Sequence, residues 1–395
     1  MSQAAFQRRA VSPARFRTPA SRPVGRAASA LLLVVLGACG VATPTDPSSQ
    51  TSVPAGALRA LTGATSTPIF STATAGERQA RGDARGLNAS GQITGAQFGL
   101  TSVGDFKPYR WTSGTGAEML IGCCGTEWGA DINDAGVVVG TAQQSLAIGA
   151  RGFVAIGTST QLLSILPGAD PDADASAVAI NNAGLIVGSS PSGSLGSARH
   201  AVLWASPGAI HDLGTLGGNN SAAIDINDAG QVIGSSQIAG DAATHYFLWT
   251  DVSGMQDLNL SVGANITSVV EINDAGQITG TYTTTGGQSH AFLYTPGSGL
   301  RDLGTLGGTT SVPTVLNGAG QVVGSSTTAG GATHAFLWTP ADGMADITAV
   351  SGITNVGRLN GSLQTVSGYV APNAPVDLAT ASIPRLVQLT VTSTR

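Results

Sequence analysis

Residues 272–317 read INDAGQITGTYTTTGGQSHAFLYTPGSGLRDLGTLGGTTSVPTVLN and form one copy of a unit that recurs along the chain. Each copy begins with an Asn that closes a short apolar run and precedes a turn of small residues. This Asn lies at seven positions spaced 43 to 48 residues apart, the last of them degenerate: Asn88, Asn133, Asn181, Asn227, Asn273, Asn317 and Asn360. A period of this length is typical of repeat proteins.

Each unit contains sequence for four short strands. In the unit at Asn227 we expect strands at 223–227, 231–235, 245–250 and 255–258, with a hairpin turn at Asp228-Ala229-Gly230. Gly-rich links of the LGTLGG type join some units to the next. Four antiparallel strands per unit of this length are typical of a β-propeller blade. The sequence therefore predicts an all-β, seven-bladed β-propeller over residues 56–395.

The two ends of such a ring must meet, because an open ring exposes two sheet edges. The last unit has sequence for three strands only, near 358–360, 363–370 and 386–391. Residues 56–63 (GALRALTG) are similar to 299–304 (GLRDLG), an expected fourth strand. We therefore predict that this N-terminal segment closes the propeller as a strand clasp.

Residues 1–39 have the features of an export signal. They contain six Arg and no acidic residue, followed by the apolar run AASALLLVVLGA, which suits a signal peptide but is too short to span a bilayer. The end of this run, LGAC, resembles the bacterial lipobox. The resemblance implies a lipoprotein signal peptide, lipidation of Cys39 and a membrane anchor; the alternative is a plain secretory signal. Residues 40–55 are rich in Pro, Ser and Thr and are expected to form a flexible linker.

The composition excludes some partners. Only 10% of the 395 residues are charged, and 55 are Gly, which fits a turn-rich β protein. Six of the 18 basic residues lie in residues 1–39, so the rest of the chain has 12 basic against 23 acidic residues. An acidic body without a basic cluster releases few counterions from nucleic acid, so we expect no nucleic-acid partner.

The motifs His290-Ala291-Phe292 and His334-Ala335-Phe336 point to a family. The repeats resemble the HAF-repeat extracellular proteins of bacteria from about Gly56 to the C-terminus, most clearly over residues 198–348. The resemblance implies a secreted or surface-exposed protein with a propeller-like fold, here as an outer-membrane or cell-surface lipoprotein. It implies no known activity.

Four histidines occupy one equivalent position in successive units: His200, His245, His290 and His334. A ring of blades holds equivalent positions apart, whereas metal ligands must converge, so we expect a hydrogen bond within each blade and no metal site. Aromatic residues near the ends of the same strands are expected to pack between blades: Trp111, Trp204, Trp249, Tyr294 and Trp338.

Positions that break the repeat are better candidates for function, because a position shared by all blades serves the fold. Cys123-Cys124 replaces the usual link before the unit at Asn133. In an oxidising compartment this pair is expected to form a vicinal disulfide; free buried thiols and bridges to another chain are the alternatives.

Asp170, Asp172 and Asp174 alternate in the sequence DPDAD, which resembles the start of a calcium loop. Ala175 occupies the place of the Gly of such a loop, and Asn181 occupies the place of its last acid. A solvated acidic loop is therefore favoured over a calcium site.

Both departures are expected in links between the fourth strand of one unit and the first strand of the next. Trp128, Asn219 and Asn220 are assigned to links of the same kind. We therefore expect one face of the propeller to bind a ligand through Trp128, Asn219, Asn220 and the three aspartates of DPDAD, because loops on a rigid scaffold commonly carry binding sites.

The favoured function is a non-enzymatic binding or adhesion module at the bacterial cell envelope. We expect a monomer without a cofactor and with an unknown protein or glycan as ligand. No Gly-x-Ser-x-Gly, His-Glu-x-x-His or phosphate-loop motif is present.

Two alternatives stay open. The first is a glycan-processing enzyme that uses carboxylates on the propeller face, for which candidates are Glu118, Glu127, Asp131 and Asp170 to Asp174. The second is a structural component of the envelope. A convergent pair of buried carboxylates in a central pocket would favour the enzyme.

Overall fold

The computed structural model describes residues 61–68, 81–98, 106–120, 127–143, 149–193, 198–348, 358–359, 364–367 and 385–391. All of these belong to one compact unit, Pro54–Arg395. The predicted signal peptide with Cys39, the linker and the pair Cys123-Cys124 lie outside the described residues.

The units at Asn133, Asn181 and Asn227 each form a four-stranded antiparallel sheet whose strands follow one another in chain order. The unit at Asn133 comprises β7 (Glu127–Ile132), β8 (Val138–Gln143), β9 (Ala150–Ile156) and β10 (Ser159–Leu162). The unit at Asn181 comprises β11 (Ser176–Ile180), β12 (Ile186–Pro191), β13 (Arg199–Ser206) and β14 (Ala209–Gly214). The unit at Asn227 comprises β15 (Gly217–Ile226), β16 (Val232–Ile238), β17 (Thr244–Thr250) and β18 (Gly254–Asp257).

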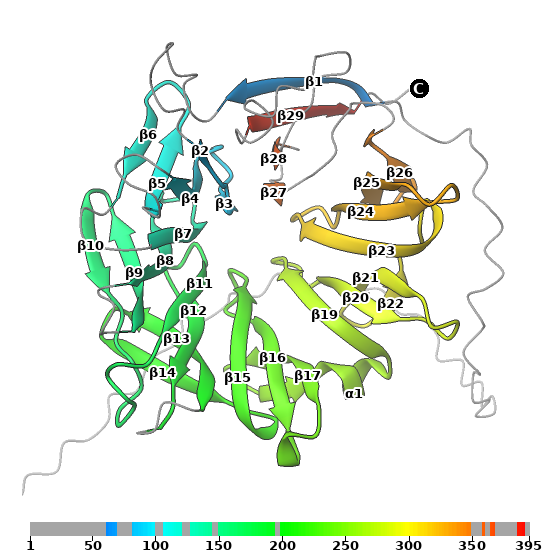
Figure 1. Cartoon of the computed structure of the whole chain (residues 1–395). Helices are drawn as coiled ribbons and strands as arrows, with labels where there is room; N and C mark the ends of the chain where they lie inside the picture. Colours follow the sequence, from blue (N-terminus) through cyan, green and yellow to red (C-terminus); the bar gives the residue numbers. More distant parts are fainter. Residues whose placement is uncertain are drawn as a thin grey trace, which may run out of the picture. The chain divides into compact units, whose positions relative to one another are not determined.

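The next two units follow the same plan. They comprise β19 (Asn265–Ile272), β20 (Ile278–Thr283), β21 (Ser289–Thr295) and β22 (Gly299–Asp302), then β23 (Gly307–Leu316), β24 (Val322–Thr328), β25 (Thr333–Thr339) and β26 (Gly343–Asp346). A parallel pairing of Ser289 with Thr310 joins these two sheets. In Figure 1 the first strands β7, β11, β15, β19 and β23 lie innermost, and they contact one another in chain order.

The unit at Asn88 departs from this plan because its first strand is in two pieces. β2 (Arg81–Gly82) and β3 (Gly86–Leu87) both pair with β4 (Ile93–Phe98), which is followed by β5 (Phe106–Thr112) and β6 (Gly116–Met119).

The C-terminal strands are β27 (Arg358–Leu359), β28 (Gln364–Ser367) and β29 (Arg385–Val391), close to where they were expected. β1 (Leu61–Pro68) pairs antiparallel with β29, with Leu61 opposite Val391. β1 overlaps the expected clasp segment 56–63 only at residues 61–63. Residues 56–60 lie outside the described part of the chain.

Two details of the unit at Asn227 differ from the expected strands. β15 begins at Gly217, because the expected link residues LGG continue into an extended backbone in which Gly217 pairs with Ile238. After β18 the chain forms the short helix α1 (Leu258–Val262), which Asp257 caps by accepting a hydrogen bond from the backbone N–H of Leu260. This helix occupies the place of the Gly-rich link.

The hydrophobic cores lie between neighbouring sheets. Trp204 is fully buried against Val139 and Val154 of the preceding unit, and Trp249 packs with Ala179 and Val187 in the same way. This confirms the predicted packing role of these two aromatic residues. Because each sheet buries its apolar face against its neighbour, a single unit has no complete core of its own.

A β-bulge recurs in the first strand of five units. In each, one extra residue lies three positions before the repeated Asn: Ala130, Val178, Ile224, Val270 and Thr314. The residue before the bulge pairs with a Gly of the second strand. At Gly280 an added Cβ would lie 2.0 Å from the backbone oxygen of Ser268 and 2.9 Å from the ring of Phe292. The recurring Gly of the second strand is therefore required by close contact with the bulged strand.

Candidate functional site

The repeated Asn residues link successive units through buried hydrogen bonds. The side-chain Nδ2 donates to the backbone oxygen of the next Asn at 3.0–3.2 Å, which links Asn88 to Asn133, Asn133 to Asn181, Asn181 to Asn227, Asn227 to Asn273 and Asn273 to Asn317. We call these residues the Asn belt. Each is at most 7% exposed. The belt therefore satisfies buried polar groups and joins neighbouring units with the same side chain.

The Oδ1 atom of each belt residue closes the turn of its own unit. In the unit at Asn227 it accepts the backbone N–H of Gln231 at 2.9 Å, while Nδ2 also donates to the Gln231 side chain at 2.7 Å. The same backbone contact recurs four residues after Asn88, Asn133, Asn181, Asn273 and Asn317. The motif N-x-x-G-Q thus describes a turn that also contacts the next unit.

The residue after the belt Asn provides a second, exposed link. Side-chain oxygens of Asp134, Asn182, Asp228 and Asp274 each accept a backbone N–H from the preceding unit at 2.7–2.9 Å. Asp228 was predicted only as part of the hairpin turn. The structure shows that the side chain at this position also joins successive units.

Acidic side chains two positions before the belt Asn form a third set, which we call the acidic ring: Asp131, Asp225 and Glu271. Their carboxylates accept the backbone N–H groups of Ile180, Ile272 and Leu316 in the next unit at 2.7–3.0 Å. Each residue of the acidic ring directly follows a bulge residue along its strand. Because the bulge interrupts the alternation of side chains, both residues face the centre.

A central pocket of about 270 Å³ lies among these residues. Its lining includes six acids from three units, Asp131, Asp134, Asp225, Asp228, Glu271 and Asp274, together with the Asn belt. No Lys, Arg or His occurs among the described residues that line it. The pocket therefore has a negative electrostatic potential.

A second cavity of about 410 Å³, which we call the collar, is lined by the bulge residues. Its walls are Ala84, Ala130, Val178, Ile224, Val270 and Thr314, and its charged lining residue is Arg85. The collar adjoins the central pocket, because Ala130 and Asp131, Ile224 and Asp225, and Val270 and Glu271 are neighbours in sequence.

The structure places the predicted binding residues Trp128, Asn219 and Asn220 on strands, because β7 and β15 begin before them. The guanidinium of Arg85 lies 5.7 Å from the ring centre of Trp128. Asn219 bonds to Asp241, and Asn220 accepts the backbone N–H of Arg199 at 2.9 Å. The two asparagines therefore hold neighbouring segments of the scaffold together.

The segment DPDAD is tied to the neighbouring strand β9. Asp174 accepts the backbone N–H of Ala150 at 2.7 Å, and Arg151 donates to the backbone oxygens of Pro171 and Ala173. Asp170 accepts the backbone N–H of Asp172 at 2.9 Å, as in an Asx turn. Within the described residues, no group of three or more His, Cys, Asp or Glu side chains is placed to hold a metal ion.

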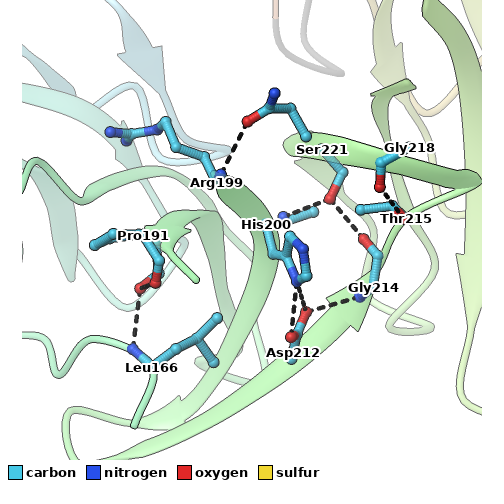
Figure 2. A network of polar contacts seen from close by, with 12 residues as sticks. Leu166, Pro191, Arg199, His200, Asp212, Gly214, Thr215, Gly218 and Ser221 are labelled. Carbon is cyan, nitrogen blue, oxygen red and sulfur yellow. Dashed lines mark hydrogen bonds and ion pairs between the residues drawn. The ribbon is translucent and has the colours of Figure 1, made fainter. Parts of the chain in front are cut away.

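The repeated histidines form the predicted contacts within each unit. Nδ1 of each lies 2.6–2.9 Å from the carboxylate of an aspartate twelve residues later: His200 with Asp212, His245 with Asp257, His290 with Asp302 and His334 with Asp346. Figure 2 shows the first of these pairs beside Ser221, which accepts the N–H of Ala201 and donates to Gly214. Ser311 makes the same two contacts, with Ala291 and Gly304.

The pKa of Asp302 reflects this surrounding. Burial alone would raise its pKa, but hydrogen bonds from His290, the backbone of Gly304 and Tyr282 hold the pKa below its ordinary value. Asp302 is therefore charged at neutral pH and fixes the orientation of the imidazole.

The candidate carboxylates of the enzyme hypothesis lie in different surroundings. Glu118 pairs with Arg110 at 2.6 Å on the outer strand β6. Glu127 is 1% exposed, and its nearest cation is Lys107 at 3.7 Å. Burial raises the pKa of Glu127, and the attraction of Lys107 offsets this only in part. Asp131 belongs to the acidic ring.

Of the acidic ring, sequence reasoning named only Asp131, as a candidate carboxylate of the enzyme hypothesis; it did not identify Asp225, Glu271 or Arg85 as parts of a site. A signal for the acidic ring and for Arg85 was present, since acids recur two positions before the belt Asn, and an Arg replaces a small or apolar residue three positions before it in the first unit. Finding them required the bulge, which makes two consecutive side chains face the same way.

The comparisons with known proteins concern the fold. No protein-family model and no curated protein matches this chain. Among solved structures, puromycin hydrolase is similar with a TM-score of 0.50 and 12% identity, over 78% of this chain and 53% of that chain. The β-propeller domain of the Trilobed protease from Pyrococcus furiosus is similar with a TM-score of 0.48 and 9% identity, over 68% and 82% of the two chains.

TolB from Acinetobacter baumannii is similar with a TM-score of 0.43 and 10% identity, over 76% of this chain and 64% of that chain. This chain thus spans less than two thirds of TolB and about half of puromycin hydrolase. The four-stranded antiparallel sheets, which follow one another around a common centre, give the described chain an all-β fold of the β-propeller class, as predicted. The likeness to puromycin hydrolase concerns the fold alone. Among the described residues, no helix is long and apolar enough to span a membrane.

The Asn belt generates a prediction for stability. Replacing Asn227 with Ala removes the bonds to Asn273 and Gln231 and leaves buried groups without partners, so it should lower the free energy of unfolding by about 3 kcal/mol. Asn182→Ala removes an exposed link and should cost less than about 1 kcal/mol. Urea unfolding of both variants measures the difference. Equal losses of unfolding free energy in the two variants would show that the buried belt stabilises the domain no more than the exposed link does.

Proposed function

We propose that the described propeller is a non-enzymatic binding module whose ligand enters the collar and the central pocket. The observation that carries this proposal is the pair of adjoining cavities, of about 410 and 270 Å³, walled by side chains from successive units. Small-molecule sites commonly have volumes of about 300–1,000 Å³ and form where several elements converge. A rigid ring of sheets around such a cavity needs little rearrangement to bind.

The engagement of the central carboxylates supports binding rather than glycan hydrolysis. A glycosidase needs two carboxyl groups that flank the scissile bond, one of them ready to give up or take a proton. In the acidic ring, Asp131, Asp225 and Glu271 each accept a backbone N–H of the next unit. These bonds hold each carboxylate in place as part of the scaffold.

We further propose that the propeller has seven blades and that β1 closes it. Two observations support closure. β1 pairs with β29 along Leu61–Pro68, in one sheet with β28 and β27. The first strands also contact one another from β23 to β27 and from β27 to β3. Sharing one blade between the two ends of the chain removes exposed sheet edges.

The lipobox-like end at Cys39 supports a third part of the proposal. The mature protein starts at Cys39, is anchored by lipid and lies at the outer membrane or the cell surface, with residues 40–55 as a tether. The binding module then faces a protein or glycan of the envelope or its surroundings.

The binding function is tested with the full-length protein on glycan and protein arrays, followed by titration of the ligand found. Ile224→Trp fills the collar and should weaken binding at least tenfold, whereas Val252→Trp, at a position 97% exposed on an outer turn, should not. Equal binding by both variants would place the site elsewhere, and chemical turnover of the ligand would show an enzyme.

The clasp is tested by deletion. Removing residues 61–68 should lower the melting temperature by about 5 °C or more, because a blade loses its outer strand and an edge is exposed. Removing eight residues of the linker, 44–51, is the matched control and should leave the melting temperature unchanged. If the two deletions behave alike, β1 does not close the fold.

The anchor is tested by fractionating cells that express the Cys39→Ser variant. The wild-type protein should partition with membranes and incorporate labelled fatty acid, and the variant should do neither. Cys123→Ser is the control and should retain the label. Fatty-acid labelling of the Cys39→Ser variant would contradict the proposal.

A further inference from the structure

The collar is nearly uniform except at one position. Five of its walls are bulge residues at the same place in the repeat, and four of these, Ala130, Val178, Ile224 and Val270, are apolar. In the first unit the corresponding position is Arg85, three residues before Asn88. A cation in an otherwise weakly polar ring is a departure from the repeat.

The guanidinium of Arg85 is held in place but remains accessible. Asp83 contacts it at 2.7 Å, and the Asp83 carboxylate itself accepts the backbone N–H of Ala96 at 2.7 Å. The hydroxyl of Tyr109 donates to the backbone oxygen of Asp83 at 2.7 Å. The Arg85 side chain is still 45% exposed, with the ring of Trp128 at 5.7 Å. Arg85 is therefore oriented before any ligand arrives.

Carboxylates border the collar, because each directly follows a bulge residue along its strand. The next residues along three strands are Asp131, Asp225 and Glu271, which belong to the acidic ring. Asp131 lies beside Gly86, the residue after Arg85, whereas Asp225 and Glu271 belong to the units at Asn227 and Asn273. A molecule whose anionic group contacts Arg85 and whose chain runs to Ile224 and Val270 therefore passes apolar walls and ends beside the carboxylates of Asp225 and Glu271. This arrangement favours a ligand with one negative charge and an apolar body, and it disfavours a second negative charge.

We propose that the collar binds a small aliphatic monocarboxylate. Its carboxylate lies against Arg85 beside Trp128, its chain lies along Val178, Ile224 and Val270, and its far end lies beside Asp225 and Glu271 of the acidic ring. This inference rests on the proposed binding function and names the ligand class. A charge-assisted hydrogen bond from the guanidinium binds the carboxylate, and burial of the chain supplies the remaining affinity. The carboxylates of the acidic ring disfavour a dicarboxylate, because they repel its second negative charge.

Titration calorimetry of the full-length protein with octanoate, 1-octanol and octanedioate tests the proposal. Octanoate should bind at least tenfold more tightly than either of the other two. Arg85→Gln should weaken octanoate binding at least tenfold, and Arg85→Lys should recover part of the loss. The matched control is Arg301→Gln, because Arg301 also stacks on a tryptophan, Trp338 at 4.9 Å, but lies outside the collar lining.

The acidic ring has its own test. The double substitution Asp225→Asn and Glu271→Gln keeps side-chain oxygens that accept the backbone N–H groups and should strengthen octanedioate binding at least tenfold. Thermal melting of each variant confirms folding. If Arg85→Gln does not fold, Ile224→Trp replaces it and should abolish octanoate binding.

Equal affinity for octanoate and 1-octanol, or unchanged octanoate binding in Arg85→Gln, would overturn the proposal. If octanoate fails to bind while an array ligand is still blocked by Ile224→Trp, the ligand class is wrong and the binding function stands. If neither octanoate nor any array ligand depends on the collar, both are wrong.

Discussion

The described propeller depends on one buried interaction, the hydrogen bond from the side chain of each belt Asn to the backbone of the next unit. An Asn amide offers two donors and an acceptor, so one side chain closes its own turn and also reaches the neighbour. Asn227, for example, is 3% exposed and bonds to both Gln231 and Asn273. Since the cores also lie between sheets, polar and apolar contacts both require the neighbouring unit. The stability of each unit is therefore coupled to that of the next.

The bulge before each belt residue connects this scaffold to a binding function. It turns two consecutive side chains towards the centre, and these form the collar and the acidic ring. Most members of the collar and the acidic ring stabilise the ring of units. The acids accept backbone N–H groups of the next unit, and the apolar collar residues recur at one position of the repeat. Arg85 is the exception among the described collar residues, and it is the position from which a ligand can be selected. The proposed function thus depends on a departure from the repeat within a central cavity.

Much of the fold could be predicted from the sequence, because the spacing of the Asn residues and the alternation of apolar runs and turns are local signals. The roles of His290 and Trp204 were predictable for the same reason, since a repeated position implies a repeated contact. The location of Trp128 and Asn219 was not, because Gly-rich link residues such as Gly217 continue into strands when a partner is available. The collar and the grouping of Asp131 with Asp225 and Glu271 were missed because a bulge changes the two-residue alternation of a strand, and the sequence carries no local mark of the bulge.

Native-state hydrogen exchange tests most directly whether the Asn belt couples the units. The backbone N–H groups of Gln231 and Gln277 donate to the side chains of Asn227 and Asn273. If the belt joins the units, these two amides exchange only when the whole domain unfolds, with the free energy measured by denaturant. If they exchange much faster than the amides of the interior strands, the turns open independently, and the belt does not couple the units.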